Sequence, residues 1–160
     1  MAHYAQINEN NIVVQVIKAN DELNTENWLI ETFGGRWVQT SYNTHANIHY
    51  GSDGLPDNGQ PLRYNYAAIG GHYDPIADAF YSLSPFPSWV INTSTYTWES
   101  PVPKPSEQLS SWNEETQSWD LIPNPPFETG WSWNPIDKIW YPSNPMALIK
   151  ENNGTATSSN

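Results

Sequence analysis

Several acidic and imidazole side chains stand at spacings that could bind a metal. His45 and His49 are four positions apart, which would place both rings on one face of a helix. The stretch HANIH lacks the glutamate that follows the first histidine in zinc proteases, and its Tyr- and Asn-rich surroundings do not favour a helix. We therefore expect structural or surface histidines here, and no metal ligands.

The loop GSDGLP and its continuation offer oxygen ligands of the kind that hard cations prefer. Asp53, Asp57 and Asn58 lie in the Gly- and Pro-rich segment 50–62, which should be an exposed loop. The segment lacks the length and the closing glutamate of an EF-hand. We expect no metal site, although the sequence leaves cation binding by this loop open.

Two pairs of carboxylates could in principle transfer protons. Glu114 adjoins Glu115, and Glu26 lies five positions before Glu31. Adjacent glutamates in a turn are normally solvated, and no pocket can be inferred around them. The sequence also lacks a nucleophile elbow, a phosphate-binding glycine loop and a dinucleotide fingerprint. It predicts a protein that is not an enzyme, with no catalytic residues and no cofactor.

Aromatic residues give the chain its strongest pattern. The 160 residues include nine Trp, nine Tyr and fourteen Pro. These residues favour pleated strands and turns, and therefore a mainly β, β-rich α+β fold with short strands. Eleven of the prolines and seven of the tryptophans follow residue 84. This shift predicts a β-rich body over 1–83, a Trp/Pro hairpin region over 84–145 and an extended tail over 146–160 that orders only against a neighbour.

Repeats occupy much of the second half. Each runs from an aromatic residue or Ile, through Asn or Asp and five further residues, to a second aromatic residue. They start 18, 21 and 21 positions apart and comprise YDPIADAF (73–80), INTSTYTW (91–98), WNEETQSW (112–119) and WNPIDKIW (133–140). Prolines follow each copy, so we expect semi-extended spacers such as SPVPKPSE and IPNPPFETG between the repeats.

The spacing within a repeat predicts a small β-hairpin. Asn or Asp at the first turn position can accept a hydrogen bond from a following backbone N–H, and a Pro after it presets φ for a type I turn. In the third repeat a four-residue loop sets Asn113 opposite Ser118 and Trp112 opposite Trp119. Such a cross-strand aromatic pair adds roughly 0.2–1 kcal/mol over an Ala pair. The matching pairs elsewhere are Tyr73–Phe80, Ile91–Trp98 and Trp133–Trp140.

These rings have three interpretations. They can form the core of hairpins too small to have another, stack on sugar rings, or contact a large partner, since aromatic residues are enriched at interface centres. The placement of each pair on one face favours the core. Stacking on sugars predicts exposed, coplanar rings at Trp112, Trp119, Trp133 or Trp140. Because isolated hairpins are marginal in water, packing on neighbours or a partner is expected, and the candidate partner-binding residues are Trp89, Trp98, Trp112, Trp119, Trp131, Trp133 and Trp140.

The first 83 residues predict a small antiparallel β domain with one short helix. AHYAQINENNIVVQVIKAN should form a hairpin turned by NENN, followed by strands in RWVQTSYNTH and RYNYAAIGGHYD. Trp37 and Val38 should face opposite sides of their strand. Between the hairpin and that strand, Asn20 or Asp21 can cap a helix that Gly34 ends.

Charge and composition limit the partners. A net charge of −11 repels nucleic acid, and the lack of Cys excludes disulfides and thiolate metal sites. No apolar run approaches the roughly 20 residues that span a membrane. The start MAHYAQINEN lacks the basic and apolar regions of a signal peptide, so we expect the chain to stay in the cytosol or to leave it inside a larger assembly.

The chain also resembles a family of small proteins and modules of marine bacteriophages, especially cyanophages. The likeness covers about residues 1–120 and rests on MAHYAQINENNIVVQVIKAN, RWVQTSYN, YNYAAIGGHYDPIADAFYSLSPFPSWVINTSTYTWESPVPKP and WNEETQSWD. The chain departs from the family pattern by the inserted GSDGLPDNGQPL and by a further Trp hairpin at 131–142. The resemblance implies a virion component.

A structural role in a phage particle fits these features together. We expect a capsid decoration or cement protein, assembled in the host cytoplasm, whose hairpin arms bind the major capsid protein, other virion subunits or further copies of the chain. Neither nucleic acid nor membrane is expected as a partner. The alternative is a glycan-binding or adaptor module of a tail fibre or tail tip.

Overall fold

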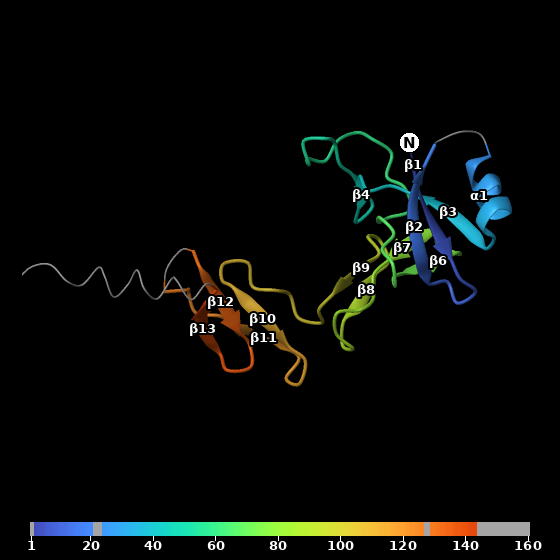
Figure 1. Cartoon of the computed structure of the whole chain (residues 1–160). Helices are drawn as coiled ribbons and strands as arrows, with labels where there is room; N and C mark the ends of the chain where they lie inside the picture. Colours follow the sequence, from blue (N-terminus) through green and yellow to red (C-terminus); the bar gives the residue numbers. More distant parts are fainter. Residues whose placement is uncertain (1, 21–23, 127–128, 144–160) are drawn as a thin grey trace, which may run out of the picture. The chain divides into compact units, whose positions relative to one another are not determined.

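A computed structural model describes residues 2–20, 24–126 and 129–143 (Figure 1). The described chain is β-rich, with a short helix and several small antiparallel sheets, which confirms the predicted fold class. It divides into two compact units, Met1–Pro101 and Val102–Asn160. The tail expected over 146–160 lies outside the described residues.

A three-stranded antiparallel sheet forms the centre of the first unit. Its strands are β1 (Ala2–Ile7), β2 (Val13–Ala19) and β3 (Arg36–Thr40), in the order β2-β1-β3. The NENN turn joins β1 to β2 as predicted, because the Asn8 side chain accepts hydrogen bonds from the backbone of Asn10 and Ile12.

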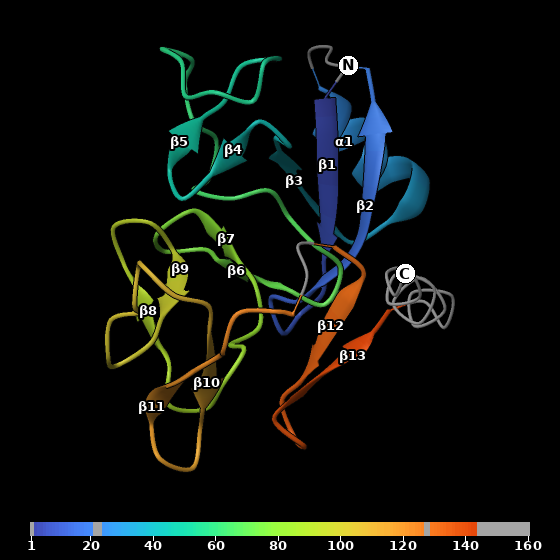
Figure 2. The same cartoon turned by 90° about the vertical axis from the view of Figure 1, so that its left-hand side faces the viewer.

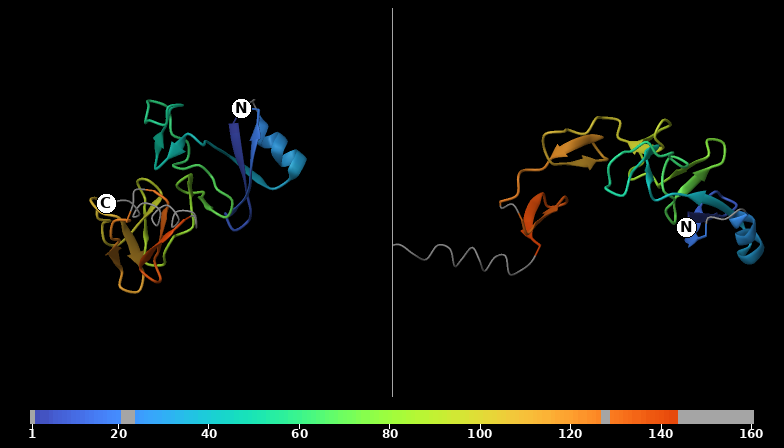
Figure 3. Two further views of the ribbon diagram at one scale, coloured as in Figure 1. Left: turned by 60° about the vertical axis from the view of Figure 1, so that its left-hand side comes forward. Right: turned by 90° about the horizontal axis from the view of Figure 1, so that it is seen from above.

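The two faces of this sheet bury two separate apolar clusters. Tyr4 packs with Leu29 of the helix and with Trp37 on one face. Ala5 and Val38, their neighbours in the strands, face the other cluster, which also contains Ile7, Val13, Ala67, Tyr73 and Phe80. Because side chains alternate along the strands, one face of the sheet packs against α1, and the other packs against the segment that contains Tyr73 and Phe80 (Figures 2 and 3).

Helix α1 (Thr25–Phe33) ends as predicted but begins later. Gly34, with φ 69°, donates its backbone N–H to the carbonyl of Ile30 over 2.8 Å. The N-cap is Asn24, in a left-handed conformation and without a side-chain cap bond. The cap predicted at Asn20 was therefore wrong: the carbonyl of Asn20 instead accepts a hydrogen bond from the Thr25 hydroxyl. The alternative cap, Asp21, lies outside the described residues.

The segment between β3 and the hairpins is irregular. β4 (Thr44–His45) and β5 (Ile48–His49) form a two-residue ladder, followed by the exposed loop expected over 50–62. The strand predicted from residue 63 was wrong over 63–69. Arg63 and Tyr64 have φ of 52° and 64°, a conformation incompatible with a strand.

Four hairpins follow the repeat pattern within the described residues. Their central cross-strand pairs match the prediction: Tyr73–Phe80, Ile91–Trp98, Trp112–Trp119 and Trp133–Trp140. The hairpins comprise β6 (His72–Asp74) with β7 (Ala79–Tyr81), β8 (Val90–Asn92) with β9 (Thr97–Glu99), β10 (Ser110–Asn113) with β11 (Ser118–Leu121), and β12 (Trp131–Asn134) with β13 (Ile139–Pro142).

Asn65 joins the second hairpin to the rest of the first unit. Its buried amide nitrogen lies within hydrogen-bonding distance of the carbonyls of Phe80, Thr95 and Tyr96, and its amide oxygen accepts from the backbone of Ala46. The first unit thus extends to Pro101, whereas the sequence placed the boundary between residues 83 and 84.

No helix in the described ranges is long and apolar enough to cross a membrane.

We expect Asn65→Ala to lower the free energy of unfolding by about 1–3 kcal/mol, because it leaves buried backbone groups without partners. Urea denaturation followed by tryptophan fluorescence measures this change. The matched control Asn58→Ala changes an exposed residue of loop 50–62 and should alter stability by less than about 0.5 kcal/mol. Equal effects of the two substitutions would contradict the role given to Asn65.

Candidate partner-binding surface

The four hairpin turns share one hydrogen-bonding device. The Asn or Asp that ends the first strand accepts backbone N–H groups two or three residues later. Asp74 accepts from Ile76 over 2.8 Å, and Asn134 accepts from Ile136 over 2.9 Å. Each turn then closes on a residue in the left-handed region, namely Asp78, Tyr96, Gln117 and Lys138.

The paired rings meet edge to face. Trp112 and Trp119 have ring centroids 5.3 Å apart and planes inclined by 68°. Trp133 and Trp140 stand at 5.4 Å and 62°. This is a favoured packing geometry for aromatic side chains within a core. The sugar-stacking interpretation predicted coplanar rings, and these pairs are not coplanar.

An indole hydrogen bond fastens three of the hairpins to the chain that precedes them. Trp98, Trp119 and Trp140 each donate Nε1–H to a backbone carbonyl, at distances of 2.8, 2.9 and 2.8 Å. The acceptors lie 16 or 17 residues upstream, at Ser82, Val102 and Pro123. Lys104 also lies over the Trp119 ring, 5.4 Å from its centroid. Each Trp therefore holds its own spacer against its hairpin.

The seven candidate tryptophans are largely occupied by these internal contacts. Trp112 is buried, and the other six are half-buried. Trp89 lies beside Phe86, with ring centroids 5.5 Å apart, and Trp131 lies opposite Pro142 in the fourth hairpin. The structure thus brings the candidates together in pairs or against spacers. Their contact with a partner stays a prediction.

Among the described residues, the most exposed large apolar side chains lie instead at two hairpin tips. Ile76 is 96% exposed and Ile136 is 88% exposed. Both occupy the same turn position, directly after a Pro, and both backbone N–H groups are bonded to the side chain that starts the turn. Ser94 and Glu115 hold the corresponding position in the other two hairpins.

An ion pair links the third and fourth hairpins inside the second unit. Lys138 Nζ lies 3.3 Å from Asp120 Oδ2, and Asn113 donates to the same carboxylate oxygen over 3.2 Å. These residues border a hollow of about 510 Å³ together with Trp112, Trp133 and Pro135.

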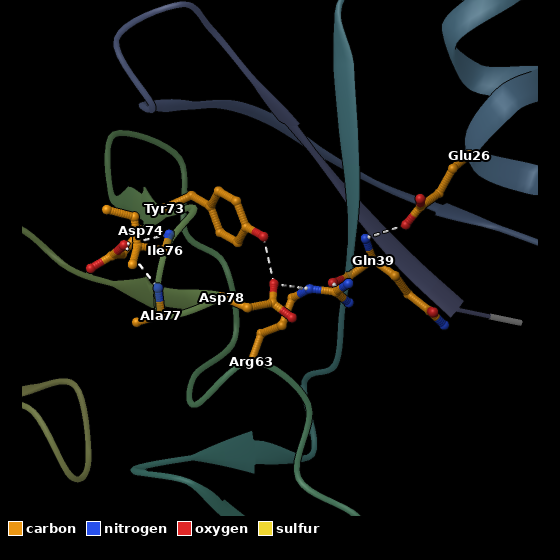
Figure 4. Close-up of polar contacts among 8 residues, drawn as sticks. All are labelled: Glu26, Gln39, Arg63, Tyr73, Asp74, Ile76, Ala77 and Asp78. Atoms are coloured by element: carbon orange, nitrogen blue, oxygen red, sulfur yellow. Dashed lines mark hydrogen bonds and ion pairs between the residues drawn. The ribbon is translucent and has the colours of Figure 1, made fainter.

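A polar cluster anchors the first hairpin to β3 (Figure 4). The Asp78 carboxylate accepts hydrogen bonds from the Tyr73 hydroxyl and from Arg63, whose Nη1 also donates to the Gln39 carbonyl over 2.9 Å. The guanidinium of Arg36 lies 5.0 Å from the Tyr73 ring centroid. Asp78 thus serves as a fixed acceptor, which is a structural role.

These contacts change the pKa values of the cluster. Burial opposes ionisation of Asp78, but the bonds from Tyr73 and Arg63 hold its pKa below the ordinary 3.8. Burial, followed by the bond to Asp78, raises the pKa of Tyr73 above 10.0. The backbone N–H groups of Ala77 and Ile76 lower the pKa of Asp74.

His49 and the acidic loop form an ordinary pair. His49 Nδ1 contacts Asp57 Oδ1, and the backbone of Gly59 donates to the same carboxylate. Asp53 accepts from the backbone of Leu55. His45 is exposed. Within the described ranges, no three His, Asp or Glu side chains gather as a metal-binding group.

Three comparisons were made with known proteins. No family model matches the chain, and neither a curated protein nor a solved structure was found to be similar to it.

We expect Trp119→Phe to free the spacer that precedes the third hairpin, because the substitution removes the indole N–H donor but keeps an aromatic ring at this position. The lost bond should lower local stability by about 0.5–1.5 kcal/mol. Faster amide exchange and proteolysis over 102–109 would measure the release. Trp28→Phe, on α1, is the matched control and should leave the spacer protected; unchanged protection in Trp119→Phe would contradict the proposed fastening.

We expect acid to destabilise the first unit partly through Asp78. Because the folded pKa lies below the ordinary 3.8, the ionised carboxylate adds stability above that value and loses the contribution as pH falls through the folded pKa. Asp78→Asn should therefore flatten the decline of unfolding free energy in this acidic range. Glu9→Gln, at an exposed position, should keep the original slope. Identical slopes for Asp78→Asn and the unmodified chain would refute the assignment.

Proposed function

We propose that this chain is a non-enzymatic structural protein of a bacteriophage particle, a decoration or cement protein bound to the outer surface of the capsid. Its partners are the major capsid protein, other virion subunits or further copies of itself. The resemblance of residues 1–120 to marine phage proteins supports this proposal. So does the net charge of −11, which suits the outside of a capsid better than its DNA-filled interior.

The observation that carries the proposal is the repeated Pro-Ile tip. A single exposed isoleucine is ordinary on a protein surface. Here, however, Ile76 and Ile136 recur at one position of a turn that Pro and a side-chain acceptor hold in shape. A rigid apolar tip loses little conformational entropy on binding. Such tips are suited to insertion into apolar pockets of a large, preformed partner.

The spacers support the same function. Pro-rich segments separate the hairpins, and the indole bonds fix each spacer to the hairpin that follows it. A partner that binds several hairpins therefore meets units that are already folded. Multiple weak contacts along one chain add up to strong attachment through their high effective concentration.

The glycan alternative, as predicted for the third and fourth hairpins, requires that the Trp rings of these two hairpins lie exposed and coplanar. The buried ring of Trp112 and the half-buried rings of Trp119, Trp133 and Trp140, inclined by 68° and 62° within their pairs, do not favour it. We therefore prefer the capsid assignment.

Localisation in purified particles tests the assignment. We expect mass spectrometry of gradient-purified virions to detect the chain, and immunogold labelling or cryo-electron microscopy to place it on the capsid exterior. Absence from purified virions would overturn the proposal. Label confined to the tail would overturn the capsid location and favour the tail-fibre or tail-tip alternative.

The tips provide a separate test with chain-deficient particles. We expect Ile76→Ser and Ile136→Ser each to weaken binding of the purified chain about tenfold or more, the loss expected when a buried isoleucine is removed. Ser94→Ala, at the same position of the second hairpin, is the matched control and should change affinity less than about twofold. Unchanged affinity in the double isoleucine variant would exclude the tips as anchors.

A further inference from the structure

A groove of about 570 Å³ lies in the first unit, apart from the hairpin tips. Its volume falls within the roughly 300–1,000 Å³ of ordinary small-ligand sites. The segments that carry it include β4, the irregular stretch after residue 63, the chain after β7, and β9 (Figure 2). Its aromatic lining comprises Tyr42, Tyr66, Tyr81, Trp89, Tyr96 and Trp98.

The described lining includes the imidazole of His45 but no carboxylate, ammonium or guanidinium group. Among the described residues that border the groove there is no Asp, Glu, Lys or Arg. An anionic ligand would find no Lys or Arg in the groove, and a cationic ligand would find no Asp or Glu, whereas a neutral ligand needs neither.

The groove also contains hydroxyl groups with spare hydrogen-bonding capacity. Within the described chain, no hydrogen bond engages the hydroxyls of Tyr42, Tyr66 or Tyr81, whereas the Trp98 indole is committed to the Ser82 carbonyl. A tyrosine hydroxyl both donates and accepts. It therefore matches a ligand whose own polar groups do both.

Internal contacts hold the groove in shape. His3 meets Tyr42 and Tyr66 edge-on, with ring centroids 5.3 and 5.6 Å apart. Asn65 borders the groove with its side-chain amide bonded to backbone on three segments. Tyr81 lies 6.4 Å from Trp98, with planes inclined by 60°. A preformed site of this kind needs little reorganisation to bind.

We propose that this groove binds a neutral oligosaccharide. Pyranose rings present C–H groups to aromatic faces and carry hydroxyls, each a donor and an acceptor, around their rims. A polyproline segment is the competing ligand, since aromatic grooves also bind such helices. Its prolines offer carbonyl acceptors without N–H donors, so it would use only half of what the tyrosine hydroxyls provide. This inference does not rest on the capsid assignment.

Saturation-transfer NMR on the full chain tests the proposal. The probes are cellotriose, maltotriose, laminaritriose and N,N′-diacetylchitobiose, with 3′-sialyllactose as a charged comparison and the peptide SPVPKPS as a polyproline comparison. We expect transfer to at least one neutral sugar, with a dissociation constant on the order of 1 mM or lower. We expect weaker transfer, or none, to the charged sugar and the peptide.

Variants locate the binding. Tyr42→Phe should weaken sugar affinity about three- to tenfold by removing one hydroxyl, and Tyr42→Ala should weaken it further by removing the ring. Tyr42 is 67% exposed, so both variants should fold. Trp28→Ala removes another exposed ring, which lies on α1 outside the groove, and should leave affinity unchanged. The proposal is overturned by transfer to none of the neutral sugars, by preference for SPVPKPS, or by equal losses in Tyr42→Ala and Trp28→Ala.

Discussion

The hydrogen bond from a tryptophan indole to an upstream carbonyl organises the hairpin repeats. Strands of three or four residues cannot form a stable hairpin alone in water. The second-strand Trp provides two contacts at once: its ring packs on the residue across the ladder, and its Nε1–H ties down the spacer. Trp is suited to this because it combines a large apolar surface with a single donor. The first hairpin has Phe80 at this position, which lacks a donor and is buried in the core of the first unit instead.

In the first unit, where the apolar clusters are small, polar side chains also tie distant segments of the chain together. Asn65 joins distant segments through its bonds to the backbone carbonyls of Phe80 and Tyr96. Arg63 does so through its bonds to the Asp78 carboxylate and the Gln39 carbonyl. Buried polar groups stabilise a fold only when their partners are in place. The irregular stretch 63–69 therefore has a defined conformation without belonging to a sheet.

Local periodicity was enough to predict the elements with local causes. The spacing of Trp112 and Trp119 about an Asn-started turn determined the register of the third hairpin, and alternation separated the two faces of β3. Contacts across 15 or more residues were not predictable in this way. The indole bonds, the partners of Asn65 and the left-handed Arg63 depend on which segments meet in space. For the indole bonds, the sequence did offer a signal: each second-strand Trp follows its Pro-rich spacer at a nearly constant separation in sequence.

The aromatic rings of the repeats are used in contacts within the hairpins, so the four repeats differ from one another mainly in their turns. Across the four repeats the starting Asn or Asp and the left-handed closing position are retained, because both define the turn geometry. The side chains at the two positions after the starting residue vary more: they are Pro-Ile in the first and fourth hairpins, Thr-Ser in the second and Glu-Glu in the third. One frame therefore presents apolar, neutral polar and acidic tips. Partner selectivity in such a chain would reside in these tip residues, while the cross-strand pairs and, in three hairpins, the indole bonds hold the hairpins that present the tips.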